Sequence, residues 1–350
     1  MRQDNSFKIM PFITLYAFAH LVVDAACAYL LLGILELNTN VILAMLTYNA
    51  IAFVLQAPLG LLIDRILNPK LAAMIGLTLV AFSFLCWNNI LVALIIVSFG
   101  NALFHVGGGS LVLSLKDKKA TYSGIYVAPG AVGLTIGSFL SISRFSIDPL
   151  TFPILLLLLC CLVYYINTPD FIRTNDGIRK INSSYGILII VLVMIPIIVR
   201  SLIGLSIDFP WKENKYLLYV LIASLLLGKV FGGILADKYG LIKVGVGGLL
   251  FSAPLLAFYS STPILGILGA FIFNFTMPVT LLAILNILPQ NKGLSFGLTT
   301  AALFIGSLPT ILKNNMWLKN DFVVLSFILL ATITMFLALQ FSNKFNTTKI

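Results

Sequence analysis

The 350-residue sequence is 60% hydrophobic and only 10% charged, whereas charged residues make up roughly a quarter of an ordinary soluble domain. Apolar runs extend from near residue 9 to near residue 341, which is too much for one signal peptide or anchor and excludes a water-soluble enzyme. The net charge of +10 comes from basic residues scattered through short connections, and this does not indicate a nucleic-acid partner.

Charged, Pro/Gly-rich and Asn-rich breaks divide the chain into twelve apolar segments. Each is close to the roughly 20 residues that a helix needs to cross a bilayer, and none shows the alternating pattern of a barrel strand. We therefore expect an all-α integral membrane protein with twelve transmembrane helices. The expected spans are 10–35, 41–63, 71–88, 90–115, 121–143, 150–167, 186–207, 216–236, 244–260, 263–288, 294–312 and 322–341.

Lys and Arg residues alternate between rich and poor connections. Outside the spans, fifteen basic residues fall on one side and five on the other. The positive-inside rule assigns the rich side, and with it both termini, to the cytoplasm. We expect a multi-pass protein of the plasma membrane with this orientation.

The longest hydrophilic stretch, Thr168–Tyr185, lies near the midpoint of the chain on the basic side. It is predicted to be a cytoplasmic linker. The expected organisation is an N-terminal six-helix half (1–167), the linker (168–185) and a C-terminal six-helix half (186–350).

An internal repeat supports this division. Two loops, one after the second expected span and one after the eighth, share Gly, Asp, a basic residue and Lys at identical spacing, 173 residues apart. Because six crossings return the chain to its starting side, the two repeats are parallel and related by an axis along the membrane normal. The paired residues are Gly60 with Gly233, Asp64 with Asp237, Arg65 with Lys238, Lys70 with Lys243, Asn101 with Asn274, Gly124 with Gly297, Gly133 with Gly306 and Gln56 with Lys229.

With these loops the sequence resembles the major facilitator superfamily of secondary transporters. The resemblance implies two six-helix repeats around a central cavity, with the Gly60–Lys70 and Gly233–Lys243 loops controlling conformational change. In the fifth span, Gly124, Pro129 and Gly133 resemble a motif of the family's antiporters, with Ala128 and Val132 in place of two glycines. The alternative is that these small residues only let two helices pack closely.

A narrower resemblance is to the fosmidomycin-resistance-type efflux branch of that superfamily. It is carried by His20-Leu-Val-Val-Asp24, by the second span from Gln56 to Asp64, and by Phe104-His105. Val106 stands where the branch commonly has Pro. The Arg that many family members carry in the fourth span is also absent.

The titratable side chains within spans are candidates for transport chemistry: His20, Asp24, His105, Arg200 and Lys229. A charge near the bilayer centre costs about 3 kcal/mol or more, so such residues usually face a cavity. His20 and Asp24 are four residues apart and share a helix face. We expect Asp24 to couple transport to protons, and Asp24 and Arg200, at similar depth in the two repeats, to form a pair. The alternative is a packing salt bridge.

Asn101 and His105 share a face in the fourth span, and Asn274 is the repeat partner of Asn101. These residues can bind substrate near the midplane or join helices by hydrogen bonds. His105 is also a secondary proton candidate, because a His titrates near neutral pH. Lys229 either belongs to the pathway or extends to the interface.

The sequence favours a secondary transporter of a small organic solute, with proton-coupled efflux as the leading hypothesis and proton-coupled uptake of a small, possibly anionic metabolite as the alternative. An intramembrane enzyme is disfavoured because no His-Glu-x-x-His pattern occurs and only two His and one buried Asp are available as base or metal ligands. The repeat disfavours a channel, and no ATP-binding loop is present. We expect a monomer that needs no cofactor and no metal, with the solute, protons and the lipid bilayer as partners.

Overall fold

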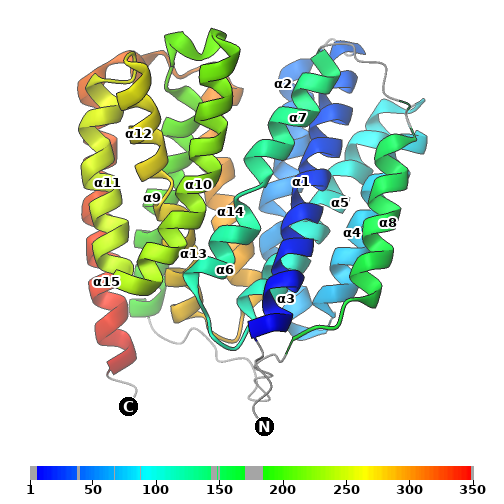
Figure 1. Ribbon diagram of the computed structural model, residues 1–350, viewed down its shortest axis with the longest axis horizontal. Helices are drawn as coiled ribbons and strands as arrows, with labels where there is room; N and C mark the ends of the chain where they lie inside the picture. Colours follow the sequence, from blue (N-terminus) through cyan, green and yellow to red (C-terminus); the bar gives the residue numbers. More distant parts are fainter. Residues whose placement is uncertain are drawn as a thin grey trace. The chain divides into compact units, whose positions relative to one another are not determined.

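The computed structural model describes residues 6–37, 40–66, 68–86, 88–142, 148, 150–169 and 184–347. Every regular element in this part of the chain is a helix (Figure 1). Most of the expected linker and the two ends of the chain lie outside the described residues. The division into two halves joined by a linker stays a prediction.

The expected all-helical membrane fold is confirmed. Within the described residues, eleven helical segments are long and apolar enough to cross a membrane, and a shorter apolar helix, Thr151–Tyr165, occupies the place of the expected sixth span. The bounds differ from the expected ones by a few residues at most; the eighth span, for example, is Lys215–Tyr239 where 216–236 was expected.

The helices follow one another with short connections. In chain order they are α1 (Ser6–Leu37), α2 (Val41–Asn49), the π-helical turn η1 (Ala50–Val54), α3 (Gln56–Arg65), α4 (Pro69–Ser83), η2 (Phe84–Cys86), α5 (Ile90–Leu113), α6 (Ala120–Val127), α7 (Gly130–Ile142), α8 (Thr151–Tyr165), α9 (Ser184–Ser206), η3 (Pro210–Glu213), α10 (Lys215–Tyr239), α11 (Leu241–Phe258), α12 (Pro263–Phe273), α13 (Thr276–Ile287), α14 (Lys292–Ile311), η4 (Met316–Lys319) and α15 (Asp321–Thr347).

Asparagine side chains start several of these helices. Asn40, Asn68, Asn89 and Asn214 each precede a helix and accept a hydrogen bond from a backbone N–H of its first turn. A side-chain oxygen at this position satisfies an N–H group that has no partner within the helix. The Asn-rich breaks in the sequence are therefore helix starts as well as connections.

The chain forms two compact units. Unit 1 comprises Met1–Lys118, Ile125–Arg173 and Lys292–Gly297, and unit 2 comprises Lys119–Gly124, Thr174–Asn291 and Leu298–Ile350. Each unit therefore includes a short segment from the other half of the sequence: the start of α14 belongs to unit 1, and the start of α6 belongs to unit 2.

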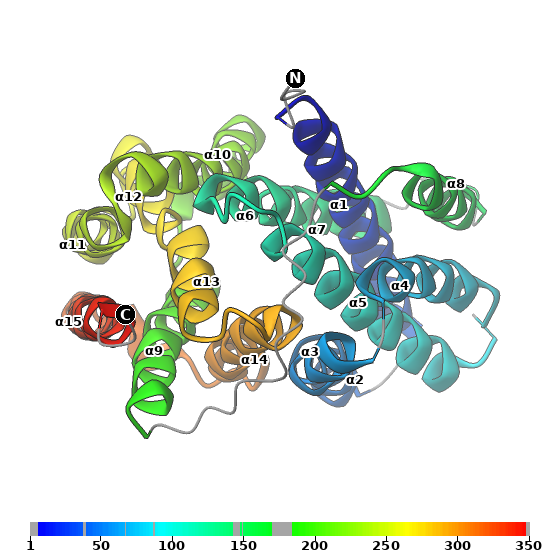
Figure 2. The same cartoon turned by 90° about the horizontal axis from the view of Figure 1, so that it is seen from below.

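In unit 1, α1 packs against α7 and α5, and α4 packs between α5 and α8 (Figure 2). Glycines permit the close approaches. A Cβ atom at Gly133 would lie 2.2 Å from the Leu21 carbonyl oxygen, and one at Gly107 would lie 2.6 Å from the Ala73 nitrogen. Helices in lipid associate through such close packing.

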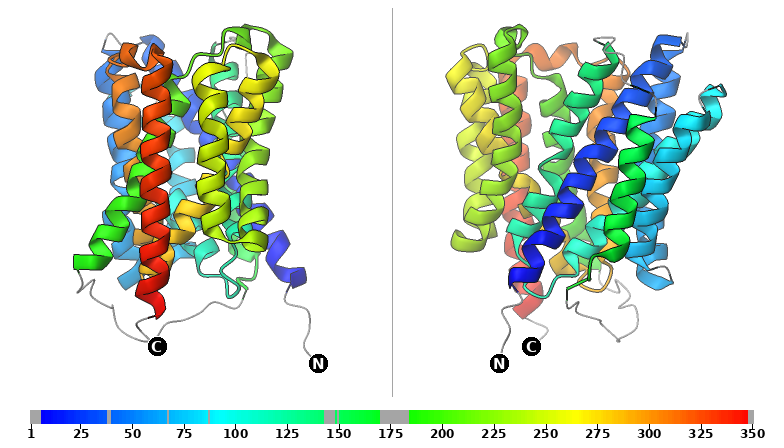
Figure 3. Two further views of the ribbon diagram at one scale, coloured as in Figure 1. Left: turned by 90° about the vertical axis from the view of Figure 1, so that its left-hand side faces the viewer. Right: turned by 45° about the vertical axis from the view of Figure 1, so that its right-hand side comes forward.

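In unit 2, α15 packs along α11 and α9, and α12 packs against α11 and α10 (Figure 3). α13 contacts α9, α10 and α11. These contacts bury Ile197, Ile203, Leu249 and Met335 completely or almost completely.

Three spans that the sequence predicts as continuous are interrupted. The second is divided into α2 and α3 by η1 and Leu55. The fifth span is divided into α6 and α7 at Ala128 and Pro129, and the tenth into α12 and α13 at Asn274 and Phe275. Pro129 lacks the N–H that a helix interior needs. In contrast, α5 continues through Gly107–Gly109, which serve as close-contact positions rather than as a bend.

Candidate functional site

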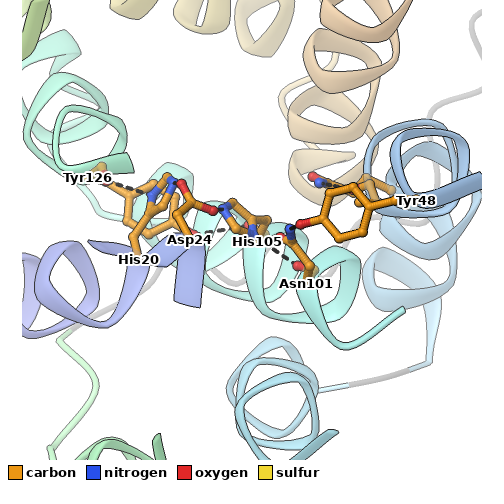
Figure 4. Close-up of polar contacts among 8 residues, drawn as sticks. His20, Asp24, Tyr48, Asn101, His105 and Tyr126 are labelled. Atoms are coloured by element: carbon orange, nitrogen blue, oxygen red, sulfur yellow. Dashed lines mark hydrogen bonds and ion pairs between the residues drawn. The ribbon is translucent and has the colours of Figure 1, made fainter. Parts of the chain in front are cut away.

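Three buried titratable side chains meet in unit 1. The Asp24 carboxylate on α1 lies 3.2 Å from His20 Nε2 through Oδ2 and 3.2 Å from His105 Nε2 through Oδ1 (Figure 4). Between 6% and 8% of each residue is exposed. His20 and Asp24 are one turn apart on α1, as the sequence predicts, and His105 comes from α5. We call these three residues the His–Asp–His cluster.

Each histidine is also held by its other ring nitrogen. His20 Nδ1 lies 2.9 Å from the Tyr126 carbonyl oxygen, and His105 Nδ1 lies 2.9 Å from the Asn101 carbonyl oxygen. A carbonyl oxygen only accepts hydrogen bonds, so both Nδ1 atoms must carry a proton. These contacts fix the orientation of both rings.

The same contacts determine what can bind between the rings and the carboxylate. A neutral imidazole protonated at Nδ1 has a bare lone pair at Nε2. In the cluster that lone pair would face a carboxylate oxygen, which is also an acceptor. Both Asp24 contacts are therefore favourable only when a proton or another cation lies between nitrogen and oxygen.

The cluster also has the donor set of a metal site. One ligand atom of each of its three residues lies within 4.8 Å of the others. Metal-ligating histidines typically donate their second ring N–H to a carbonyl or carboxylate. The sequence predicted no metal site, because residue spacing reveals His20 and Asp24 as neighbours but gives no indication that His105 joins them.

A hydrogen-bond chain extends from the cluster. Asn101 Nδ2 donates to the Tyr48 hydroxyl at 2.6 Å, and the Tyr126 hydroxyl donates to the His105 carbonyl at 3.1 Å. Tyr48 and Tyr126 are not predicted from the sequence, because a tyrosine in an apolar run is most often a packing residue. Tyr126 lies inside the Gly124–Gly133 motif, which is the one signal that could have identified it.

That motif borders the cluster. A Cβ atom at Gly130 would lie 2.6 Å from Asp24 Oδ2 and 2.7 Å from His20 Nε2, so only glycine leaves room for the cluster. Gly133 contacts α1 one turn further on, and Gly124 packs on the Lys229 carbonyl oxygen in unit 2. Pro129 lies at the break between α6 and α7.

Arg200 is the corresponding buried charge of unit 2. It is 7% exposed, and its Nη1 atom donates to the hydroxyls of Thr276 and Thr280, both at 3.4 Å. Asp24 and Arg200 each have their contacts inside their own unit. The expected pair between them stays a prediction.

The other two predicted pathway residues also lie in unit 2. Lys229 is 8% exposed, so protein atoms surround its side chain. Asn274 follows the last residue of α12, and its Nδ2 donates to the Ala270 carbonyl at 2.9 Å. Asn274 and Asn101 thus have different partners although they are repeat partners.

The two repeated loops hold helix N-termini. In unit 1, Asp64 accepts hydrogen bonds from the backbone N–H groups of Gly293 and Leu294, at 2.8 and 2.9 Å. In unit 2, Asp237 accepts from the N–H groups of Ala120 and Thr121, at 2.8 and 3.0 Å. A carboxylate at this position satisfies free N–H groups and the positive end of the helix dipole.

The remaining loop residues have other surroundings. Gly60 and Gly233 are close-contact positions beside Gly293 and Thr121. Lys70 Nζ donates to the carbonyls of Tyr164 and Ile166 at the end of α8, at 2.9 and 2.8 Å. Lys238 lies over the Tyr239 ring, 5.1 Å from its centroid, and the side chains of Arg65 and Lys243 are exposed.

The sequence matches the model of one protein family. The family model described as Major Facilitator Superfamily matches residues 12–311. No curated protein matches the sequence.

Solved structures share the fold at low sequence identity. The chain is similar to the E. coli fucose:proton symporter FucP (TM-score 0.72, 15% identity, 96% of this chain and 99% of that chain). It is similar to the human organic anion transporter MFSD10, or TETRAN (TM-score 0.71, 13% identity, 96% and 100%). It is also similar to a bacterial homologue of the iron transporter ferroportin (TM-score 0.65, 14% identity, 96% and 99%).

Proposed function

The chain belongs to the major facilitator superfamily, and from this premise we propose that it is a proton-coupled secondary transporter of a small organic solute. Family membership makes it a multi-pass membrane transporter and not an enzyme. The proposal adds the coupling ion, which is the proton held by the His–Asp–His cluster. It also adds efflux in exchange for protons as the direction.

The pair of contacts between Asp24 and the two histidines carries this proposal. Both Nδ1 atoms are committed to carbonyls, so each 3.2 Å contact between Asp24 and a histidine Nε2 needs a proton between its nitrogen and oxygen. Two protons therefore complete the cluster. Buried titratable groups of this kind within spans mark proton relays in transporters.

Alternating access is supported by the repeated loops. Asp64 and Asp237 make equivalent contacts at helix N-termini, and these contacts involve backbone groups that a moving helix can leave and regain. Family members rock two repeats about a fixed site. We infer that the Gly60–Lys70 and Gly233–Lys243 loops hold one conformation of this cycle.

Efflux is supported by the resemblance of the fifth span to the antiporter motif, which includes Pro129 at the break between α6 and α7 and Gly133 on α7 beside Asp24. The competing function is uptake by symport. FucP, a fucose:proton symporter, shares the fold, and fold alone does not distinguish the two directions. The direction of net flux under an imposed pH gradient separates them.

Location, orientation and oligomeric state are part of the proposal. The excess of basic residues on one side of the expected spans supports a plasma-membrane protein with both termini in the cytoplasm. The internal repeat supports a functional monomer, because each chain contributes both halves. Labelling of single cysteines from either side of the membrane tests the orientation.

The decisive experiment uses the purified protein in liposomes that contain a pH-sensitive dye. Candidate solutes are tested for proton movement in the wild type, in Asp24→Asn and in Asp208→Asn, which removes an exposed loop carboxylate as a matched control. We expect solute-dependent proton flux in the wild type and the control, and downhill solute movement without proton flux in Asp24→Asn. Accumulation of solute by Asp24→Asn against its gradient, with wild-type pH dependence, refutes the proposal.

The same liposomes distinguish protons from a metal as the occupant of the cluster. ZnCl₂ and MnCl₂ are added in place of organic solutes. Saturable uptake of either ion that Asp24→Asn abolishes, with no organic solute moving protons, would assign the cluster to metal transport and overturn proton coupling.

A further inference from the structure

Among the described residues, the hydrogen-bond partners of Arg200 are neutral hydroxyls. Its Nη1 atom faces Thr276 and Thr280, one turn apart on α13. Both hydroxyls donate their own protons to backbone carbonyls, Thr276 to Phe273 at 2.8 Å and Thr280 to Thr276 at 3.0 Å. The two oxygens are therefore acceptors toward the guanidinium, and both contacts are long at 3.4 Å.

Most of the guanidinium's hydrogen-bonding capacity is unused. An arginine has five N–H donors and stays charged at any working pH. Among the described residues, nothing accepts from Nε or Nη2, and no carboxylate lies within ion-pair distance of Arg200. A buried cation without a counter-ion is unfavourable, and in a transporter it is typical of a ligand site.

The described residues of unit 2 include no buried anion that could supply that counter-ion. Its buried charged side chains in the described part are Arg200 and Lys229, both cations. Asp237 is committed to the start of α6, and Asp208 pairs with Lys212 in an exposed loop. Arg200 therefore has no buried counter-ion among the described residues of unit 2.

The α12–α13 break adds to the positive environment. Thr276, one of the two residues that contact Arg200, is the first residue of α13. The N-terminal end of a helix has a partial positive charge, and interrupted transmembrane helices direct such ends at anionic substrate groups.

We propose that Arg200, Thr276 and Thr280 form the binding site for an anionic group of the transported solute, a carboxylate or a phosphate. This inference rests on the proposed transport function and names its substrate class. The planar fork of Nε, Nη1 and Nη2 matches two oxygens of such a group. A cationic solute would meet uncompensated repulsion, and an uncharged solute would leave the guanidinium without a counter-ion.

Binding to the purified protein tests this site without a proton gradient. The protein is placed in nanodiscs of phosphatidylcholine only, so that no anionic lipid headgroup competes. The probes are acetate, succinate, citrate and glycerol 3-phosphate, with succinamide and glycerol as uncharged analogues and 1,4-diaminobutane as a cation of similar length. Calorimetry or thermal stabilisation reports binding.

The variants isolate the guanidinium. Arg200→Gln removes charge and fork and should weaken binding of the best anion roughly 10- to 100-fold, as expected when a charged hydrogen-bond partner is lost. Arg200→Lys keeps the charge, so it tests the site if the Gln variant does not fold, and should weaken binding about 10-fold. Lys215→Gln makes the same charge change at an exposed residue and should bind like the wild type.

Three outcomes would overturn the proposal: no anionic probe binds the wild type, the uncharged or cationic analogues bind as well, or Arg200→Gln binds anions like the wild type. Asp24→Asn separates this proposal from proton coupling. We expect it to bind anions normally while losing proton flux, so each proposal can fail without the other.

Discussion

Asp64 and Asp237, 173 residues apart in the sequence, cap equivalent helix N-termini. The residues that donate to them are related by the same offset, because Ala120 and Thr121 correspond to Gly293 and Leu294. The repeat that the sequence shows in its loops thus extends to the groups that the loops hold. Each Asp binds the start of a helix from the other half of the sequence.

Replacing Asp237 should weaken its contact with α6. The two carboxylate oxygens of Asp237 accept from the N–H groups of Ala120 and Thr121. Asp237→Asn keeps one of these acceptor oxygens but loses the other and the negative charge. We expect the capped conformation to lose about 1 kcal/mol of stability, in the range of other helix-cap substitutions. Thermal unfolding of the detergent-solubilised protein measures this loss.

The repeat provides an internal comparison for this prediction. Asp64→Asn should cause a similar loss, and the double variant should show the sum, because the two contacts lie in separate units and share no residue. A double variant no less stable than either single one would show that the two caps do not act independently.

Gly133 should not tolerate a methyl group. Its Cβ would lie 2.2 Å from the Leu21 carbonyl oxygen and 3.1 Å from the Asp24 Cβ, so Gly133→Ala must push α7 away from α1. We expect a loss of about 1–3 kcal/mol, as for other overpacked sites, together with reduced proton flux. The control is Gly204→Ala, where a Cβ meets nothing within 4 Å. Equal melting temperatures for Gly133→Ala and Gly204→Ala would contradict the close contact between Gly133 and Leu21.

The transmembrane spans were predictable because few backbone structures are stable in the hydrocarbon region of a bilayer. Every N–H and C=O in the hydrocarbon region must be paired within the segment, so long apolar runs become helices and polar breaks become connections. The pairing of His20 with Asp24 followed for a similar reason, because residues four apart meet on any helix. Both inferences depend on local geometry alone.

The rest of the site depends on which helices are neighbours, and spacing does not reveal that. His105 reaches Asp24 from α5 because α5 packs on α1. Tyr126 reaches His20 through a backbone carbonyl, a group that every residue has. The interruption at Asn274 and Phe275 has only an indirect signal, Pro278, which cannot donate to the Asn274 carbonyl as a continuous helix would require.

Asp208 shows how little an exposed charge pair should matter. Its hydrogen bond and ion pair with Lys212, at 2.9 Å, lower the pKa of Asp208 from its usual value. A carboxylate whose pKa is lowered in the folded state stabilises the fold at pH values above the usual Asp pKa of about 3.9. This stabilisation is lost as pH falls through the lowered pKa. Because 73% of the side chain is exposed, we expect Asp208→Asn to change stability by well under 1 kcal/mol, with melting curves at pH 5 and pH 8 equally unaffected.

The two contacts between Asp24 and the histidines should determine how many protons are transported with each solute molecule. If each Asp24–His contact holds one proton, removing one histidine removes one proton position. His105→Gln keeps a side chain that can donate to Asp24 through its amide, but this amide does not exchange a proton at working pH. For the solute found in the liposome screen, we expect the proton-to-solute ratio to fall by one.

The proton-to-solute ratio is measured by opposing a pH gradient with a solute gradient and finding the solute gradient at which net flux reverses. His20→Gln should lower it by the same amount, because both contacts are 3.2 Å long and both Nδ1 atoms bind carbonyls. If His105→Gln slows transport but leaves the ratio unchanged, His105 orients Asp24 and the coupling proton resides elsewhere in the cluster. Unequal effects of the two variants would instead assign the second proton to the histidine with the larger effect.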